Sequence, residues 1–205
     1  MKRRELKILG LSYSQTQVGA YVLVLADKRG SRKLPLIIKP LEAQRIALEL
    51  EGIKSPRPLT HDLIKSLTDS FGIDIQEIYI HSLAEGVFYT KLITTNGIDE
   101  VEIECTAGDG IALSVIYGCP IYTTGEILES AGIIVNDDGS DVDDLDDIDI
   151  EEYFDDEEDE TFPERIVSIE DLEKMMEGAI ENEEYEIAAE LRDRIQELKD
   201  KDGLG

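Results

Sequence analysis

The order of the expected elements predicts an α+β fold, with a mixed, largely antiparallel sheet, flanking helices and a C-terminal helical hairpin. Strand-like runs come in two groups, each followed by helical patterns, whereas a doubly wound parallel sheet would alternate them one by one. Asn96-Gly97 joins two strand-like runs and is a strong signal for a β-hairpin. Residues 168–199 repeat apolar side chains at helical spacing on both sides of Asn182, which predicts the helical hairpin.

Three strands are expected at the start of the chain, at residues 4–12, 18–26 and 33–38. The second run is almost continuously apolar, as strands in the middle of a sheet are. The charged residues and the glycine at 27–30 predict a turn after it. These three runs therefore form the first part of the sheet.

Two helices are expected next, at residues 40–51 and 61–71. The first has one apolar face, which we expect to be buried, formed by Ala43, Ile46, Ala47 and Leu50. Its polar side chains fall on a different face and comprise Glu42, Arg45 and Glu49. The second helix carries large apolar side chains on one side, namely Leu63, Ile64, Leu67 and Phe71.

The second group of strands covers residues 73–80, residues 86–95 and a run after Gly97. The apolar alternation of the first run changes phase between Gln76 and Glu77, which predicts a bulge there. The run after Gly97 alternates glutamates with apolar residues, so we expect one of its faces to be solvated. A helix, a short strand and a last helix complete this part, at 108–117, 120–122 and 124–131.

The chain of 205 residues has a net charge of −27, but this charge is unevenly distributed. Residues 1–135 are near balance at −3, which suits one folded domain. Residues 136–162 hold 16 acidic and no basic side chains, so they repel one another and offer little apolar surface. We expect an acidic, disordered linker there, before a hairpin unit at 163–205. An alternative use of the acidic segment is to bind a basic partner or to mimic nucleic acid.

The sequence carries no sign of membrane insertion or secretion. No apolar run reaches the length of about 18 residues that a membrane helix needs. The basic N-terminus, MKRRELKILG, lacks a following apolar segment and a cleavage site. Cys105 and Cys119 form neither a CxxC motif nor a metal cluster and are typical of reduced thiols. We therefore expect a cytoplasmic protein without membrane association.

The second helix of the hairpin contains Tyr185-Glu-Ile-Ala-Ala-Glu-Leu-Arg-Asp-Arg-Ile. This stretch resembles the UVR motif of the nucleotide-excision-repair proteins UvrB and UvrC. Two short helices alone bury little apolar surface, so we expect them to pair with a partner protein's hairpin. The resemblance assigns this interaction to Tyr185, Ala188, Ala189, Arg192, Asp193 and Ile195. We expect an independent docking module on a tether; the alternative is that the hairpin packs against the main domain.

Two segments of the main domain carry a further resemblance. The first contains Pro40-Leu-Glu-Ala, Leu50-Glu-Gly and Arg57-Pro-Leu-Thr-His-Asp-Leu, and the second is Gly108-Asp-Gly-Ile-Ala-Leu-Ser. Together they are similar to the bifunctional nuclease family, a bacterial and plant domain, over roughly residues 5–133. The resemblance implies a nuclease that hydrolyses DNA and RNA, depends on a metal ion and forms dimers.

The same segments hold the candidate catalytic residues, which are Asp109, His61, Asp62 and Glu42. Carboxylate-bound Mg²⁺ or Mn²⁺ can activate water and neutralise phosphate charge, and the expected ligands are Asp109 and Asp62. His61 lies in the first turn of a helix, where the dipole disfavours a positive imidazolium, so a neutral base suits this position. Arg57, between two prolines, is pre-positioned for an anion. Arg45 is the second expected substrate contact.

Each candidate residue also suits an ordinary structural role. Glu42 and Glu49 fit a solvated helix face, and His61 fits a surface or cap position. Asp62 and Asp109 complement helix dipoles. Arg57 can equally pair with a neighbouring glutamate.

Residues 105–108 depart from the usual family pattern, because no basic residue precedes Asp109 there. That departure weakens any phosphate contact from this strand. The alternative function is therefore a non-catalytic interaction or regulatory protein linked to DNA repair or stress response. The nuclease hypothesis requires the candidate residues to share one site, whereas the interaction-protein hypothesis does not.

We also expect the main domain to form a homodimer. Val18 to Leu25 and Pro35 to Ile38 offer more apolar strand than one small sheet needs. The family resemblance points in the same direction.

Overall fold

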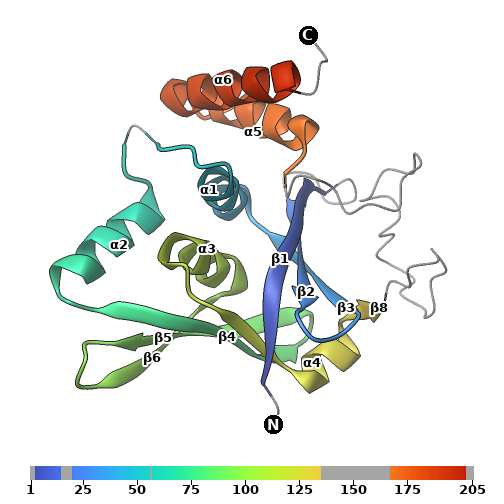
Figure 1. Ribbon diagram of the computed structural model, residues 1–205, viewed down its shortest axis with the longest axis vertical. Helices are drawn as coiled ribbons and strands as arrows, with labels where there is room; N and C mark the ends of the chain where they lie inside the picture. The colour runs from blue at the N-terminus through green and yellow to red at the C-terminus, as the bar shows by residue number, and fades with distance from the viewer. Residues whose placement is uncertain (1–2, 15–19, 56, 135–166, 202–205) are drawn as a thin grey trace.

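A computed structural model describes residues 3–14, 20–55, 57–134 and 167–201 (Figure 1). Its strands in chain order are β1 (Arg3–Tyr13), β2 (Tyr21–Asp27), β3 (Arg32–Ile38), β4 (Asp74–Ala84), β5 (Val87–Thr95), β6 (Glu100–Thr106), β7 (Ile121–Thr124) and β8 (Ile133–Ile134). Its helices are α1 (Pro40–Leu50), α2 (Thr60–Ser70), α3 (Ala107–Tyr117), α4 (Gly125–Ser130), α5 (Ile169–Glu181) and α6 (Tyr185–Lys201).

All eight strands belong to one sheet, in the order β6-β5-β4-β7-β1-β2-β3-β8. β4 and β7 pair in parallel, and every other pair among the described strands is antiparallel. Helices pack on this sheet and a pair of helices follows at the C-terminal end. The structure therefore confirms the predicted α+β fold with a mixed, largely antiparallel sheet and a C-terminal helical hairpin.

Local chemistry explains the two irregular positions that the sequence predicted in the second group of strands. The register of β4 on β5 shifts between Ile75 and Glu77, at the predicted bulge. In the β5–β6 turn, Gly97 has a φ of 86°, which suits glycine. The Asn96 side chain accepts the backbone N–H groups of Ile98 and Asp99 at 2.9 and 2.8 Å. The predicted β-hairpin is therefore present and held by its own asparagine.

The core lies between the sheet and the helices α1 and α3. β2 is buried at every position, as expected of a central strand. On α1 three residues of the predicted apolar face, Ala43, Ile46 and Ala47, are 0% exposed, whereas the fourth, Leu50, is partly exposed. The polar face of α1 is also covered: Glu42 is only 5% exposed and Arg45 only 7%, so the solvated-face prediction for Glu42 is wrong. α3 packs against α1 and removes this face from solvent.

Two apolar surfaces that the sequence suggested for the core are exposed instead. On α2, Leu63, Leu67 and Phe71 are exposed, because α2 stands at one end of the molecule (Figure 1). β6 is an edge strand, and Val101 and Ile103 on its apolar face are 52% and 47% exposed. The described helices therefore leave one end of the sheet uncovered.

The apolar strands that motivated the dimer prediction are used within the fold. Leu34, Leu36 and Ile38 of β3 are buried, and so is all of β2. Val18 lies outside the described residues. Most of these side chains therefore form the core of the single subunit, whereas Ile37 of β3 is 58% exposed, and the homodimer stays a prediction.

The helical hairpin is packed onto the main domain and is not a separate module in the structure. Leu172 and Leu191 are both 0% exposed and belong to the same apolar cluster as the core of the main domain. α5 contacts α1 and β1, and Leu11 of β1 forms an isolated parallel bridge with Val167. The structure therefore shows the alternative arrangement, in which the hairpin packs against the main domain. The predicted acidic linker at 136–162 lies outside the described residues.

Within the described part of the chain, no helix is long and apolar enough to cross a membrane.

Candidate functional site

The candidate site is built where the first turns of α2 and α3 meet the start of α1. His61 lies in the first turn of α2 and is 6% exposed. Its Nε2 lies 3.1 Å from Oδ1 of Asp109, which lies in the first turn of α3. These two predicted residues are 48 positions apart in sequence and form a direct pair. Because the Asp109 carboxylate holds Nε2, Nδ1 is the ring nitrogen of His61 that can exchange a proton with a ligand.

Asp109 is oriented by Thr106, the N-cap of α3. The Thr106 hydroxyl donates to Oδ2 of Asp109 at 2.8 Å and accepts the Asp109 backbone N–H at 3.1 Å. Sequence reasoning missed Thr106. The signal for it is a threonine three residues before an acidic residue at a helix start, the spacing of an N-terminal capping pair.

Glu42 is a buried carboxylate that links α1 to α3. Its Oε2 accepts the backbone N–H of Lys39 at 2.9 Å, and its Oε1 lies 3.3 Å from the Thr106 hydroxyl. Gly108 lies directly against it, since a Cβ built there would be 2.0 Å from Oε2. Both oxygens of Glu42 therefore have protein partners, which gives this residue a positioning role beside the His61–Asp109 pair.

Arg45 ties α1 to α2. One of its terminal nitrogens lies 2.6 Å from Oε2 of Glu49 and 2.9 Å from Oδ1 of Asp62. The other oxygen of Asp62 accepts the backbone N–H of Leu59 at 2.9 Å. The Arg45 side chain is only 8% exposed, and its Nε is buried without a hydrogen-bond partner among the described residues. Asp62 is thus a helix-capping and ion-pairing residue in this arrangement.

Two of the polar residues considered from sequence lie away from this group. Arg57 is exposed, and its Nε lies 3.3 Å from Oε2 of Glu186 in α6. His81 lies in β4, where its ring is 6.2 Å from that of Tyr79 and 6.5 Å from that of Tyr89. The structure therefore joins His61, Asp109 and Glu42 through Thr106, and turns Arg57 towards the hairpin.

The donor set does not form a metal site in the described residues. They contain no group of three or more His, Cys, Asp or Glu side chains that could hold a metal ion. The two expected ligands have separate partners: Asp62 binds Arg45, and Asp109 binds His61 and Thr106. The expected dependence on Mg²⁺ or Mn²⁺ stays a prediction.

Both cysteines lack the character of a nucleophile. Burial raises the pKa of Cys105 to about 12, and the negative charge of Asp109 adds to this effect. Burial also raises the pKa of Cys119 to about 11. The thiolate is the reactive form, so neither side chain contributes a reactive group near neutral pH.

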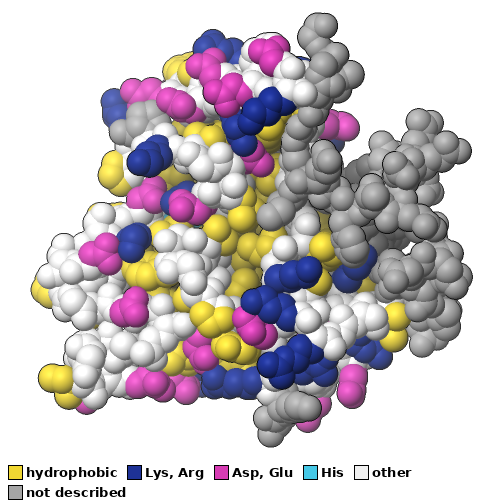
Figure 2. Space-filling model, in the orientation of Figure 1, with side chains coloured by type: hydrophobic (Ala, Val, Ile, Leu, Met, Phe, Trp, Pro, Cys, Tyr) yellow, Lys and Arg dark blue, Asp and Glu magenta, His cyan; other side chains and the backbone are white. Residues whose placement is uncertain are grey.

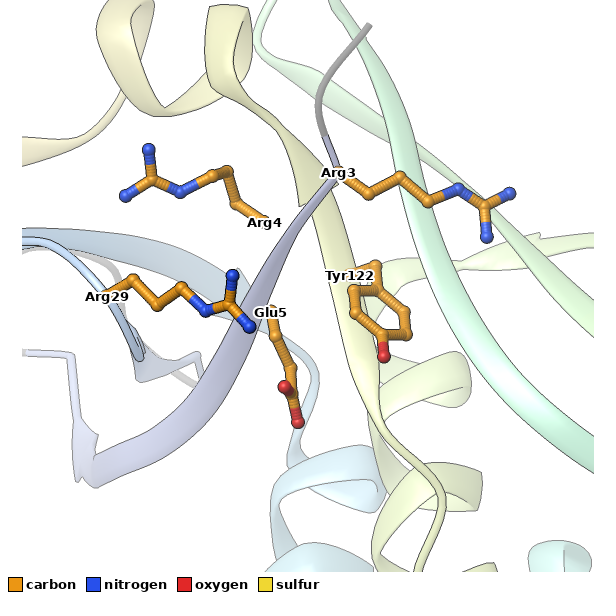
Figure 3. Close-up of a pocket in the computed structure, with 5 residues that line it drawn as sticks. All are labelled: Arg3, Arg4, Glu5, Arg29 and Tyr122. Carbon is orange, nitrogen blue, oxygen red and sulfur yellow. The ribbon is translucent and has the colours of Figure 1, made fainter.

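A hollow of about 270 Å³ lies elsewhere, at the start of β1. Lys and Arg side chains gather in this region (Figure 2). However, Arg3 and Arg4 leave β1 on opposite sides and their guanidinium groups point apart (Figure 3). Arg3 is paired with Glu77, and Arg4 with Asp27. These arginines do not converge on one anion, so the His61–Asp109 group remains the better candidate site.

Comparison with known proteins concerns the main domain as a whole and the hairpin. The model of the bifunctional nuclease domain matches residues 23–136, which include α1, α2 and α3. The chain belongs to the bifunctional nuclease domain family. The UvrB/uvrC motif matches residues 167–201, so the chain carries the family domain and a UVR hairpin in the predicted order.

Individual members of the family resemble this chain to different degrees. Two uncharacterised proteins of Mycobacterium tuberculosis strains are 38% identical over 133 residues, 65% of this chain and 79% of theirs. Bifunctional nuclease 1 of Oryza sativa and Bifunctional nuclease of Oryza minuta are 24% identical over 119 residues. That match covers 56% of this chain and 36% of the rice proteins.

Proposed function

We propose that this bifunctional nuclease domain hydrolyses phosphodiester bonds of DNA and RNA at the His61–Asp109 pair. The observation that carries the proposal is the contact of 3.1 Å between Nε2 of the buried His61 and Oδ1 of Asp109, whose side chain is 45% exposed. It lies within the segment matched by the family model. The nuclease names of the rice relatives point to the same chemistry.

In this proposal His61 acts as the general base. Asp109 accepts a hydrogen bond from Nε2–H, which fixes the tautomer and leaves Nδ1 free to take a proton from water. As water attacks phosphorus, the bond from phosphorus to the leaving oxygen breaks and that oxygen takes a proton from solvent. The Asp109 carboxylate stabilises the imidazolium that forms when His61 takes the proton of the attacking water. Thr106 and Glu42 keep Asp109 in place. Arg45 is the proposed phosphate contact beside them, because its guanidinium reaches Asp62 in the first turn of α2, next to His61.

The test is hydrolysis of single- and double-stranded DNA and RNA by the full chain, with Mg²⁺, with Mn²⁺ and with a chelator. We expect His61→Ala to lower kcat/KM by about 10²-fold or more, the typical contribution of a general base. His81→Ala is the matched control, because it removes a histidine outside this site. Equal loss in both variants, or unchanged hydrolysis in His61→Ala, would refute the assignment.

A second candidate function is a non-catalytic interaction protein linked to DNA repair or stress response. The observation that favours it is the UVR match over residues 167–201. Tyr185, Arg192 and Asp193 are exposed on the docked hairpin and accessible to a protein partner, whereas Ala188 and Ile195 are buried. No hydrolysis of any substrate, together with capture of a hairpin-containing protein that depends on Tyr185, would favour this function.

We also propose a homodimer, formed through the uncovered end of the sheet. Phe71 on α2 is 72% exposed, and Leu63 on the same helix is 64% exposed. β6 has β5 as its one described neighbour in the sheet, so its other edge is open. In a two-fold symmetric dimer, each copy would place its exposed α2 side chains and its open β6 edge against those of the other copy. Both surfaces would then be buried.

A further inference from the structure

The α5–α6 hairpin is held to the end of α1 by a strong ion pair. Arg194 donates from two nitrogens to Oε2 of Glu51, at 2.9 and 2.8 Å. The Glu51 side chain is only 9% exposed, and the hydrogen bond to it raises the pKa of Arg194 above its ordinary value. Gln44 of α1 also donates to Glu184, at 3.1 Å. These contacts fix the hairpin against one side of α1.

The other side of α1 belongs to the candidate site. Glu42 contacts Thr106 of the α3 N-cap, and Arg45 contacts Asp62 of α2. One short helix therefore carries hairpin contacts on one face and site contacts on another.

The segment between α1 and α2 makes a direct contact with the hairpin. Glu186 lies at the N-terminal end of α6. There Nε of Arg57 lies 3.3 Å from Oε2 of Glu186. Within the described residues, this is the one ion pair that Arg57 makes. The arginine proposed from sequence as a phosphate contact is thus occupied by a carboxylate of the same chain.

We propose that the docked hairpin is an autoinhibitory element, in which Glu186 holds Arg57 in place of a nucleic-acid phosphate. The inference rests on the proposed function only in taking a nucleic-acid phosphate as the anion that competes with Glu186. A carboxylate and a phosphate both accept hydrogen bonds from a guanidinium group, so they compete for Arg57. Glu186 belongs to the same chain and therefore acts at a high effective concentration.

The exposure of this pair sets the strength of the inhibition. Arg57 is 84% exposed and Glu186 is 57% exposed, so water and salt weaken their attraction. A weak pair suits a graded control that a ligand can overcome. Removing it should change affinity by about two- to fivefold, the range that such exposed pairs usually contribute.

A protein that binds the hairpin would relieve the inhibition. The apolar seam of the hairpin, with Leu172 and Leu191 at 0% exposure, is buried in the docked state. A partner that uses this seam must first displace the hairpin from α1, which releases Arg57. Binding of such a partner and binding of nucleic acid then strengthen each other by the same factor.

The test compares Glu186→Gln with Glu190→Gln in the full chain. Glu190 is an exposed glutamate one turn further along α6, and no contact of its side chain is described. Binding of a fluorescent single-stranded DNA 12-mer is followed by anisotropy at low salt. We expect Glu186→Gln to lower Kd by about two- to fivefold and Glu190→Gln to leave it within error. In an Arg57→Ala background the effect of Glu186→Gln should disappear.

A second measurement does not depend on nucleic acid. Hydrogen exchange of residues 51–59 should become several-fold faster in Glu186→Gln and Arg194→Ala, and not in Glu190→Gln. Equal Kd values for both glutamine variants would overturn the proposal. If no variant binds DNA, hydrogen exchange alone decides. Equal exchange rates in Glu186→Gln and Glu190→Gln would then overturn the proposal. Faster exchange in Glu186→Gln would support a restraint of residues 51–59 by Glu186, while the missing DNA binding would count against the nuclease function. Absence of hydrolysis with intact binding would likewise count against the proposed function alone.

Discussion

Replacing Gly108 by alanine tests how closely Glu42 is held against the start of α3. A Cβ at position 108 would lie 2.0 Å from Oε2 of Glu42, 2.4 Å from its carboxyl carbon and 3.1 Å from Oε1. Ordinary contacts of a Cβ begin at 3.4 Å, so the carboxylate must move by more than 1 Å. Glu42 is only 5% exposed and has little room to do so.

The expected loss of stability follows from the contacts that this movement breaks. Overpacking of a closed site costs about 1–3 kcal/mol. Losing the hydrogen bond from the Lys39 N–H to a buried carboxylate adds about 1.5–3 kcal/mol. The better helix propensity of alanine returns about 1 kcal/mol. We therefore expect Gly108→Ala to lower the free energy of unfolding by about 1.5–5 kcal/mol.

Urea denaturation of the full chain measures this change, with Gly125→Ala as the matched control. Gly125 also lies in the first turn of a helix, and nothing lies within 4 Å of a Cβ built there. That variant should be as stable as the parent protein or slightly more so. Adding Glu42→Ala to Gly108→Ala should recover part of the loss, because the two residues contact each other and their effects are not additive. Equal stability of Gly108→Ala and Gly125→Ala would refute the reasoning.

Three further predictions concern the buried hydroxyls, the cysteines and the uncovered apolar end. Thr90 is 1% exposed and its hydroxyl has no partner among the described residues, so Thr90→Val should leave thermal stability unchanged or raise it. Thr94→Val should lower stability by about 1 kcal/mol, because it removes a hydrogen bond of 2.9 Å to β6. Cys105 and Cys119, with pKa values raised to about 12 and 11, should react with iodoacetamide at pH 8 far more slowly than free cysteine. The reaction should accelerate as pH rises towards 11, and rapid labelling at pH 8 would contradict the burial argument. Phe71→Asp should shift the protein from dimer to monomer in light scattering, and an unchanged mass would rule out α2 as the interface.

Most of the local structure could be predicted from the sequence, because its signals act over a few residues. The bulge in β4 appears as a change of apolar phase between Gln76 and Glu77, and the β5–β6 turn as Asn96-Gly97. The burial of β2 follows from its continuous apolar run. Each of these signals depends on neighbours within a strand or a turn, so no knowledge of the rest of the chain is needed.

The candidate site was predicted only in part. His61 and Asp109 were named as candidates, yet their pairing depends on how α2 and α3 pack. The role of Glu42 was misjudged as a solvated position, since the helix that covers it comes some 65 residues later in the chain. Thr106 was missed because a capping threonine is common, and only the packed structure brings its hydroxyl to two carboxylates.

The fold class, the family and the C-terminal hairpin follow from the sequence, because each depends on spacing and residue type along the chain. Which polar residues meet and which apolar faces stay open follows from the packing of distant segments. Arg45 of α1 and Asp62 of α2 form an ion pair, and Arg57 is paired with Glu186 of the hairpin. Leu67 and Phe71 have the spacing of a core-facing helix but remain exposed, since the end of the sheet beside α2 has no described covering element. The physical reason is that burial and ion pairing depend on distances between segments, and spacing within one segment does not specify them.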